Sequence, residues 1–462
     1  MANNLVYGIK DKPKFSQLIV FAIQQLLAIM AATILVPAII GSGMSQSAAL
    51  FGAGVGTIIY QLFTKFKSPV FLGSSFAFIN SMLAAFAGAV STAAGYAGII
   101  LGALLAGLVY VVIAIIVKFA GVAWINKLMP TVVIGPTVAL IGLSLAVNAV
   151  NDLSLGKVLT EVVTPVIKDN AIVEEVSKVS ACSPYVAMIC GIITLFAVFM
   201  FSVYGKKMAK LIPFVLGIVV GYAVASIFTV IGILTDNVAL QVINFAAFKE
   251  MTLFQIPDFS FVEAIKGVKE IDASFIATIA VAYVPVAFVV FAEHIADHKN
   301  LSSIIDQDLL EEPGLHRTLL GDGVGSIAGA FFGGCPNTTY GESVGCVAIT
   351  RNASVVTITT TAIMCMVISF FGPFVTLLSS IPNCVMGGVC VALYGFIAVS
   401  GLKMIQKVDL NESANLFVVS AILIPGIGGL SLTFGKVTIT SIACSLILGI
   451  VTNILLNKFK KA

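Results

Sequence analysis

Apolar runs of membrane-spanning length recur along this chain, and they limit the folds that it can adopt. The 462 residues are 59% hydrophobic and only 10% charged, with a mean hydropathy of +1.09, whereas soluble domains carry about 25% charged residues. Runs of about 17 to 25 apolar residues suit transmembrane helices, because the strands of a membrane barrel show alternating segments of about ten. The sequence therefore predicts an all-α polytopic membrane protein.

Breaks at glycine, proline and charged residues divide the apolar runs into fourteen predicted transmembrane segments. Seven lie in the first half, near residues 16–40, 47–64, 75–88, 94–119, 124–149, 183–203 and 208–234. Seven lie in the second half, near residues 273–296, 316–333, 341–350, 353–380, 383–402, 413–434 and 437–456. Because each half has an odd number of spans, the second half enters the membrane upside down, which predicts a 7+7 inverted repeat of the kind found in secondary transporters.

Basic residues predict the orientation of these spans. With the amino end inside the cell, 18 of the 25 lysines and arginines fall in inner segments, as expected for cytoplasmic loops. The seven others fall mainly in two long loops, 150–182 and 235–271. The first apolar segment is too long for a signal-peptide core. We therefore expect a multi-pass protein of the cytoplasmic (inner) membrane, with an uncleaved first span and both termini cytoplasmic.

Motifs for metals, cofactors and nucleic acids are missing from the sequence. The eight cysteines lie mostly inside apolar segments, without a CxxC pair or a Cys/His cluster at zinc spacing. They indicate neither disulfides nor a metal site, and no basic stripe suggests nucleic acid. The sequence also lacks a nucleotide fingerprint and an HExxH motif. We expect no cofactor, no catalytic residues and no enzymatic activity.

Two predicted spans, the third and the tenth, are unusually short and occupy corresponding positions in the two halves. They follow residues 68–78 and 333–341, segments whose residues favour β-structure. Extended backbone is tolerated at membrane depth only where it is buried in protein or lines a cavity. We expect two short antiparallel strands, each preceding a half-helix whose free N–H groups can bind polar ligand atoms.

Two carboxylates, Glu293 and Glu342, lie beside long apolar runs. A carboxylate near the centre of a membrane helix costs roughly 2.5 to 3.5 kcal/mol, so such groups usually face a cavity and serve function. Glu342 follows Gly341 at the start of the tenth span, where the helix dipole favours an acceptor. A simple N-terminal cap is the structural alternative for Glu342. We predict that both carboxylates belong to a binding site.

The eighth span carries further ionisable groups close to Glu293. Asp297 lies four residues on and shares its helix face, whereas His294 and His298 turn away from it. For His298, a position at the cytoplasmic end of the span is the plainer interpretation. Glu293 lies a full turn deeper, and we expect it or its neighbour to exchange a proton near neutral pH.

Phe76 opens the broken helix of the first half, after a Gly-Ser-Ser turn. Most of the 32 phenylalanines must face lipid or pack in the core. An aromatic ring at a helix start can stack on a flat ligand while its backbone donates a hydrogen bond. We therefore add Phe76 to the predicted site.

Several motifs carry a resemblance to a known family. They are LGSSFAFI at 72–79, AEH at 292–294, PGLHR at 313–317, and PNTTYGE at 336–342, which continues as ESVGCVAITR at 342–351. Over nearly its whole length the chain resembles the nucleobase–ascorbate transporter (nucleobase:cation symporter) family, and within it the bacterial uracil permeases. The resemblance implies fourteen spans, with a core domain at 1–122 and 260–382 and a gate domain at 123–259 and 383–462.

The resemblance also implies roles for single residues. Glu293 and Glu342 are similar to the ligand carboxylates of the family, and Phe76 and Gly341 to the residues that supply backbone contacts. Relatives have a histidine four residues after the first glutamate, where this chain has Asp297 and then His298. Asp297 and His298 are therefore, with Glu293, the proton-coupling candidates.

Two further residues differ from the family pattern and are expected to support the site. Ser343 stands where the family signature usually has Asn, and Gln25 stands where some relatives have a histidine in the first span. The shorter Ser343 side chain is expected to loosen a supporting hydrogen bond, and Gln25 is expected to support the site in place of the histidine. No metal ligand is implied.

Together these features predict a proton-coupled secondary active transporter that imports uracil by alternating access. Two carboxylates and two backbone N–H groups would match the two N–H groups and two carbonyls of uracil. A xanthine or urate permease is the alternative, for which we expect Gln or Asn near the signature start and a roomier pocket. An anion channel of the same architecture would need basic residues between the half-helices. Sodium in place of the proton stays an alternative, and the relatives suggest a homodimer.

Overall fold

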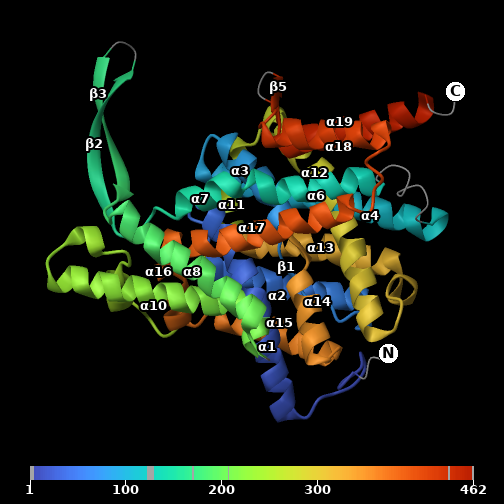
Figure 1. The fold of residues 1–462 in the computed structure, drawn as a ribbon, viewed down its shortest axis with the longest axis horizontal. Coiled ribbons are helices and arrows are strands. Elements are labelled where there is room, and N and C mark those ends of the chain that lie inside the picture. The colour runs from blue at the N-terminus through green and yellow to red at the C-terminus, as the bar shows by residue number, and fades with distance from the viewer. Residues whose placement is uncertain (1–4, 122–129, 169–170, 207, 435–436, 460–462) are drawn as a thin grey trace. The chain divides into compact units, whose positions relative to one another are not determined.

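The computed structural model describes residues 5–121, 130–168, 171–206, 208–434 and 437–459 (Figure 1). The chain divides into two compact units. Unit 1 comprises Met1–Ser144, Phe254–Phe371 and Tyr394–Ala462, and unit 2 comprises Leu145–Leu253 and Gly372–Leu393. This division does not follow the predicted core and gate domains, whose boundary at residues 122 and 123 lies outside the described residues. The core and gate division stays a prediction.

Unit 1 is mainly helical and contains two pairs of short strands (Figure 1). Its elements are α1 (Phe15–Ile40), α2 (Gln46–Phe63), β1 (Leu72–Ser74), η1 (Phe76–Phe78), α3 (Ile79–Ala87), α4 (Thr92–Ala120), α6 (Thr131–Ser144), α11 (Ser260–Gly267), η4 (Val268–Glu270), α12 (Ala273–Ile305), η5 (Leu310–Gly314), α13 (Leu315–Gly333), β4 (Asn337–Thr339), α14 (Gly341–Thr350), α15 (Val355–Ile368), the second part of α17 (Asn383–Ile405), α18 (Ser413–Ile427), β5 (Leu432–Phe434), β6 (Val437–Ile439) and α19 (Ser441–Phe459).

Unit 2 combines helices with a long hairpin. Its elements are α7 (Ala146–Asp152), β2 (Leu159–Lys168), β3 (Ala171–Ser180), α8 (Pro184–Tyr204), α9 (Met208–Leu211), α10 (Pro213–Leu234), η2 (Val238–Leu240), η3 (Phe245–Lys249), α16 (Gly372–Ser380) and the first part of α17. Figure 1 shows β2 and β3 running side by side. Their register extends from Leu159 opposite Ser180 to Lys168 opposite Ala171. Residues 150–182, predicted as a long loop between two spans, therefore contain this hairpin.

Seven segments of the described chain are helical, long and apolar enough to cross a membrane. They are Phe15–Ile40, Thr92–Ala120, Thr131–Asp152, Pro184–Tyr204, Pro213–Leu234, Ala273–Ile305 and Asn383–Ile405. Four shorter apolar helices are Phe76–Ala87, Val355–Ile368, Ser413–Ile427 and Ser441–Leu456. The prediction of a mostly helical, polytopic membrane fold is confirmed. Fourteen spans in an inverted repeat stay a prediction.

Some predicted boundaries differ from the structure. The eighth span was predicted to end at residue 296, but α12 continues to Ile305. The residue that caps it, Asp306, has a left-handed backbone with φ of 56°. The segment 353–380 is divided into α15 and α16. The segment 413–434 ends as a helix at Ile427, and β5 takes its last residues. The predicted start of the fifth span at residue 124 lies outside the described residues.

Glycines let the helices of unit 1 approach one another closely around α13. A Cβ atom at Gly52 of α2 would lie 2.6 Å from the carbonyl oxygen of Gly329, and one at Gly56 would lie 2.7 Å from that of Gly325. These backbones are thus too close for any side chain between them. Small residues at such crossings are typical of membrane helix packing, where contact replaces the hydrophobic driving force. This packing fixes α2 and α13 around the strands described next.

The strands β1 and β4 form a two-stranded antiparallel sheet inside unit 1. Leu72 lies opposite Thr339 and Ser74 opposite Asn337, and the Ser75 N–H donates to the Pro336 carbonyl at 2.9 Å. All six strand residues are buried. The outer edge of β1 is also paired, because the Thr57 hydroxyl of α2 bonds the backbone N–H and carbonyl of Leu72 at 2.9 and 3.2 Å. Extended backbone is thereby satisfied within the protein, as membrane depth requires.

Candidate functional site

The eighth predicted span, α12, carries two acidic residues among largely buried neighbours. Phe291, Ala292, His294 and His298 are buried, whereas Glu293 is exposed and Asp297 is half-buried. Glu293 and Asp297 are one helical turn apart and lie on one face, as the spacing predicted. An exposed carboxylate among buried neighbours is available to a ligand.

The side chain of Asp297 points toward β4 and the start of α14. The Thr339 hydroxyl at the end of β4 donates to Oδ2 of Asp297 at 2.6 Å. A Cβ atom built on Gly341 would lie 3.8 Å from Oδ1 of Asp297, with no other atom nearby within 4 Å. Thr339 therefore holds one carboxylate oxygen while the other faces Gly341. Sequence reasoning missed Thr339, because a single threonine in a strand gives no signal of its own.

The start of α14 is accessible at its first residue. Gly341 is exposed, and Glu342, in the first turn of α14, is half-buried. The Glu293 carboxylate interacts electrostatically with those of Asp297 and Glu342, and Asp297 with Glu342. The structure thus brings the three acids of the predicted site together. Neighbouring like charges repel, and the N–H donors of a ligand would relieve that repulsion.

The two residues predicted to support the site lie in contact with each other. The Gln25 side-chain amide of α1 donates to the Ser343 hydroxyl of α14 at 2.5 Å. Both side chains are buried, at 2% and 0% exposure. Ser343 directly follows Glu342, so this bond links α1 to the first turn of α14. The serine in place of the usual asparagine still has a hydrogen-bond partner.

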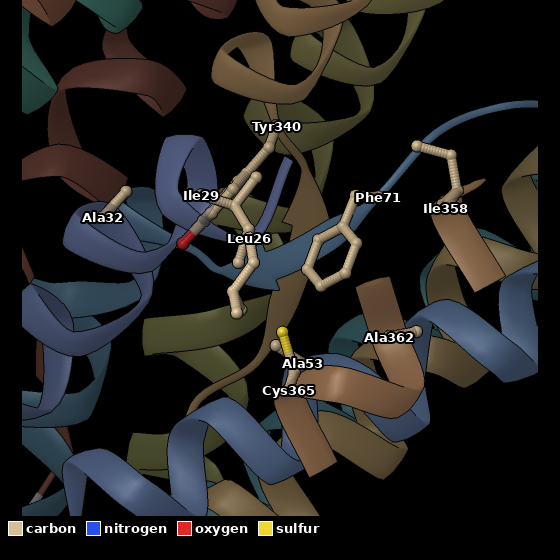
Figure 2. Close-up of a cluster of buried hydrophobic side chains, with 9 residues drawn as sticks. All are labelled: Leu26, Ile29, Ala32, Ala53, Phe71, Tyr340, Ile358, Ala362 and Cys365. Carbon is tan, nitrogen blue, oxygen red and sulfur yellow. The ribbon is translucent and has the colours of Figure 1, made fainter. Parts of the chain in front are cut away.

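Phe76 lies at the opposite end of the short sheet from Gly341, where β1 leads into η1. It is half-buried and packs against the cluster in Figure 2, defined by Leu26, Ile29, Ala32, Ala53, Phe71, Tyr340, Ile358, Ala362 and Cys365. Its ring also meets the edge of Tyr394 at a centroid distance of 6.3 Å. Since the paired strands run in opposite directions, η1 and α14 leave the sheet at opposite ends.

Tyr340 joins the two strand segments at the start of α14. Its hydroxyl donates to the carbonyl of Ser74 at 2.9 Å and accepts from Thr33 of α1 at 3.4 Å. A Cβ atom at Gly73 would lie 2.4 Å from its ring. Figure 2 shows this ring beside Leu26 and Ile29 of α1. Gly73 is thus required for the close approach of Tyr340, a role that the sequence pattern did not reveal.

A buried histidine network lies behind the carboxylates. Nδ1 of His294 is 2.7 Å from Oδ2 of Asp322, and its Nε2 is 2.9 Å from the Thr318 hydroxyl. That hydroxyl donates to the Leu315 carbonyl, so it accepts from Nε2. One proton is then shared between His294 and Asp322. The expectation that His294 only turns away from the acids missed this pair.

His298 belongs to the same network and is fully buried. Its Nδ1 donates to the His294 carbonyl at 2.8 Å, so its Nε2 accepts from the Tyr60 hydroxyl at 2.7 Å. The rings of His294 and His298 stack at 4.1 Å. His298 is therefore buried within α12, which continues to Ile305, and both of its ring nitrogens have partners. Its proton-coupling role stays a prediction.

Within the described ranges, no group of three or more His, Cys, Asp or Glu side chains is arranged to hold a metal ion. Carboxylates, backbone N–H groups and one aromatic ring are the groups that the predicted site offers to a ligand.

Comparisons with known proteins agree with the sequence resemblance. A family model described as "Permease family" matches residues 16–435. The chain is 38% identical to a uracil permease of Bacillus caldolyticus over 457 residues, which cover 98% of this chain and 95% of that one. It is 36% identical to a uracil permease of Bacillus subtilis (strain 168), covering 98% and 96%, and 33% identical to one of Escherichia coli (strain K12), covering 96% and 92%.

Solved structures with the same fold are far less similar in sequence. The transmembrane domain of the cyanobacterium bicarbonate transporter BicA aligns with a TM-score of 0.59 at 14% identity, covering 96% of this chain and 99% of that chain. The murine anion transporter Slc26a9, in an inward-facing state, aligns with a TM-score of 0.64 at 12% identity, covering 98% of this chain and 69% of that chain. At these identities the likeness shows the fold alone.

Proposed function

The chain belongs to the permease family as a nucleobase transporter, and from that premise we propose that it imports uracil across the cytoplasmic membrane, coupled to protons. The observation that carries the proposal is the group of Glu293, Asp297 and Glu342 beside the open start of α14. The curated relatives named above, which match nearly the whole chain, are uracil permeases. They support the choice of substrate.

In this proposal Glu293 and Glu342 each accept a hydrogen bond from a ring N–H of uracil. The backbone N–H groups of Phe76 and Gly341 donate to its carbonyls, and the Phe76 ring covers one face of the base. Uracil has two N–H groups and two carbonyls, so each of its polar groups finds a partner. Cytosine carries an amine in place of one carbonyl and a bare acceptor in place of one N–H, and it leaves protein groups unpaired.

We assign the supporting contacts to Gln25 and Ser343, whose hydrogen bond fixes the first turn of α14. For proton coupling we retain Glu293, Asp297 and His298. The position of Asp297 between Thr339 and Gly341 favours it over His298, whose two ring nitrogens already have partners. A proton bound by one of these acids would lower the negative charge of the group. Binding of uracil would then depend on the pH gradient.

The proposed mechanism is alternating access in a protein of fourteen spans, built as a 7+7 inverted repeat. The core domain (1–122 and 260–382) would carry the ligand, and the gate domain (123–259 and 383–462) would close each side in turn. Both termini would be cytoplasmic, and two chains would form a homodimer in the inner membrane. The short antiparallel strands β1 and β4, each followed by a helix start inside unit 1, favour this architecture.

Two alternatives have different expectations. A xanthine or urate permease would bind the same imide in a larger pocket, so hydrogen-bond matching alone does not exclude it. An anion transporter of the same fold would need a basic side chain at the start of α14, where this chain has Glu342 near Glu293. The acids make the anion alternative the weaker one.

Uptake of labelled uracil into proteoliposomes tests the proposal. With an inward proton gradient, uptake should exceed that without a gradient, and a protonophore should abolish the excess while equilibrium binding persists. Uptake that follows a sodium gradient and ignores pH would overturn proton coupling. Competition by xanthine at equal concentration would favour the purine permease, and competition by cytosine would contradict the roles of Glu293 and Glu342.

A further inference from the structure

The segment before the first helix is bonded to the far end of α14. The Val6 N–H donates to the carbonyl of Arg351 at 2.8 Å, and the Ala353 N–H donates to the carbonyl of Tyr7 at 2.9 Å. Tyr7 and Asn352 form a parallel β-bridge. Residues 5–11, here called the strap, thus pair with residues 351–355, which directly follow α14.

Two more contacts extend this pairing along the strap. The Val355 N–H donates to the Ile9 carbonyl at 3.1 Å, and the Ser354 hydroxyl donates to the Asp11 carbonyl at 2.6 Å. The Asp11 carboxylate in turn accepts from the Gly8 N–H at 2.7 Å, which closes a turn in the strap. The strap is therefore an ordered part of unit 1, held at several points.

Apolar side chains of the strap reach the packing between the two acid-bearing helices. Leu5 and Ile9 are partly buried against a cluster that includes Leu301 of α12 together with Val344 and Val347 of α14. Glu293 and Asp297 lie on α12, and Glu342 lies on α14. The strap thus packs against the contact that sets the relative positions of the three carboxylates.

Among the described helices, α1 and α12 make the main contacts with α14, while Gly341 and Gly345 present faces with little or nothing within 4 Å of a built Cβ atom. A helix of ten residues is about 15 Å long and stiff. A shift at its Arg351 end therefore moves Gly341 and Glu342 at its start.

We propose that the strap is a positioning segment: by fixing the carboxyl end of α14 against α12, it sets the affinity of the site for its ligand and stays attached throughout transport. The inference rests on the proposed function for the identity of the ligand, uracil. It assigns a function to residues 5–11 that lies outside the carboxylate site itself. The strap contacts no ligand in this proposal and acts only through α14.

The principal test compares Ile9→Asp with the matched control Val6→Asp. Ile9 packs into the cluster, whereas the Val6 side chain is 56% exposed and its backbone bond is retained in the control. In purified, folded transporter, Ile9→Asp should raise the KM and Kd for uracil about tenfold, which corresponds to about 1.4 kcal/mol, with a change in maximal rate below about twofold. Val6→Asp should match the unmodified protein. An unchanged Kd in folded Ile9→Asp would overturn the proposal.

Where Ile9→Asp does not fold, Ser354→Ala supplies the second variant. Ser354 makes no side-chain cap to α15, so the loss removes only its bond to the strap. Ser354→Ala should raise the Kd, and Ser354→Thr, which keeps the hydroxyl, should restore it. Equal Kd values for the two variants would contradict the positioning role.

A readout without ligand separates this inference from the proposed function. Amide hydrogen exchange of residues 344–350 should be faster in Ile9→Asp than in Val6→Asp, because local opening becomes easier when packing is lost. Failure of the unmodified protein to bind uracil would refute the proposed substrate, yet the exchange rates would still decide the structural part. Equal exchange in the two variants would overturn it.

A disulfide tests whether the strap stays attached. Tyr7→Cys combined with Asn352→Cys places two thiols at bridge partners, within the Cα separation that a disulfide spans. Oxidation removes two electrons and two protons from the pair, with oxidised glutathione as the acceptor. The oxidised and the reduced forms of this variant should transport uracil at equal rates. Inhibition by oxidation that is reversed by reduction would show that the strap must detach.

Discussion

The two strand segments of unit 1 lead into helix starts of different character. After β1, Ser75, Ala77 and Phe78 are buried and only Phe76 is partly accessible, while the Phe78 ring stacks on Tyr283 at 5.4 Å. After β4, Gly341 is exposed and the next residue is an acid. The first segment is thus packed like a protein core, and the second resembles a binding surface.

The glycines of the two segments, Gly73 and Gly341, have different roles. Gly73 in β1 leaves room for the Tyr340 ring, which would otherwise be 2.4 Å from a Cβ atom. A Cβ atom built on Gly341 would make only an ordinary contact, with Oδ1 of Asp297 at 3.8 Å. One glycine permits packing within the protein, and the other keeps the helix start free. Substitutions in each segment should therefore have different effects on stability and binding.

The largest effect is expected at the acid of the second segment. Glu342→Gln replaces an acceptor with a group that also donates, so a ring N–H of uracil loses its partner. An unpaired buried group costs about 1 to 3 kcal/mol, or about 5- to 150-fold in affinity. Ligand-induced thermal stabilisation by uracil should disappear while the unliganded protein keeps its Tm. Glu311→Gln, an exposed acid outside the site, is the control, and normal stabilisation of Glu342→Gln would refute the assignment.

The second prediction concerns the packed segment. Gly73→Ala forces a methyl group into the Tyr340 ring, and overpacking of this kind costs about 1 to 3 kcal/mol. We expect a lower Tm in detergent, measured by the unfolding of the purified protein without ligand. A Tm equal to that of the unmodified protein would mean that the ring of Tyr340 can shift freely, contrary to its bonds with Ser74 and Thr33.

The matched substitution in the second segment should act in the opposite way. Gly341→Ala adds a methyl group where only Asp297 is near, and alanine in a helix is favoured over glycine by about 0.5 to 1 kcal/mol. The Tm should therefore be unchanged or slightly higher, while the Kd for uracil rises because the methyl group occupies the ligand's side. Stronger destabilisation than in Gly73→Ala would reverse the comparison.

A smaller effect is expected where the two segments are joined. Tyr340→Phe keeps the ring in its cluster but removes the hydroxyl that donates to the Ser74 carbonyl. A net hydrogen bond contributes about 0.5 to 1.5 kcal/mol. We expect a modest fall in Tm, smaller than that of Gly73→Ala. The double variant Tyr340→Phe with Thr33→Val should add little, since the two hydroxyls share one network.

Much of this arrangement was accessible from the sequence. Apolar runs predicted helices that the structure contains, and the four-residue spacing of Glu293 and Asp297 predicted their shared face. The interruption of apolar runs by Gly-Ser-Ser and Pro-Asn-Thr segments pointed to extended backbone at residues where β1 and β4 lie. These are local signals, carried by neighbours along the chain.

The side-chain and backbone contacts that sequence reasoning missed join residues far apart in the chain. His294 meets Asp322 across 28 positions, and Thr339 meets Asp297 across 42. The strap meets the end of α14 across more than 300 positions. No spacing rule links such residues, because their proximity follows from the packing of whole helices. The β2–β3 hairpin was missed for another reason: its strands mix acids, lysines and valines, a pattern that also occurs in loops.

The smallest effect is expected outside both segments, at the exposed ion pair between Lys67 and Glu312, which are 2.5 Å apart. The Lys67 ammonium, by its hydrogen bond and its charge, lowers the pKa of the Glu312 carboxyl below the usual value. A lowered folded-state pKa means that the contribution of the pair is complete above the unfolded pKa, near 4.3, and is lost as the pH falls through the folded pKa. Solvent and salt screen such a pair strongly.

Glu312→Gln should therefore change the Tm barely at pH 7, and the Tm values of the variant and the unmodified protein should converge on acidification. The Kd of this variant for uracil should equal that of the unmodified protein. A changed Kd would show that the segment before α13 is coupled to the carboxylates, so that ligand binding would depend on residues outside both strand segments.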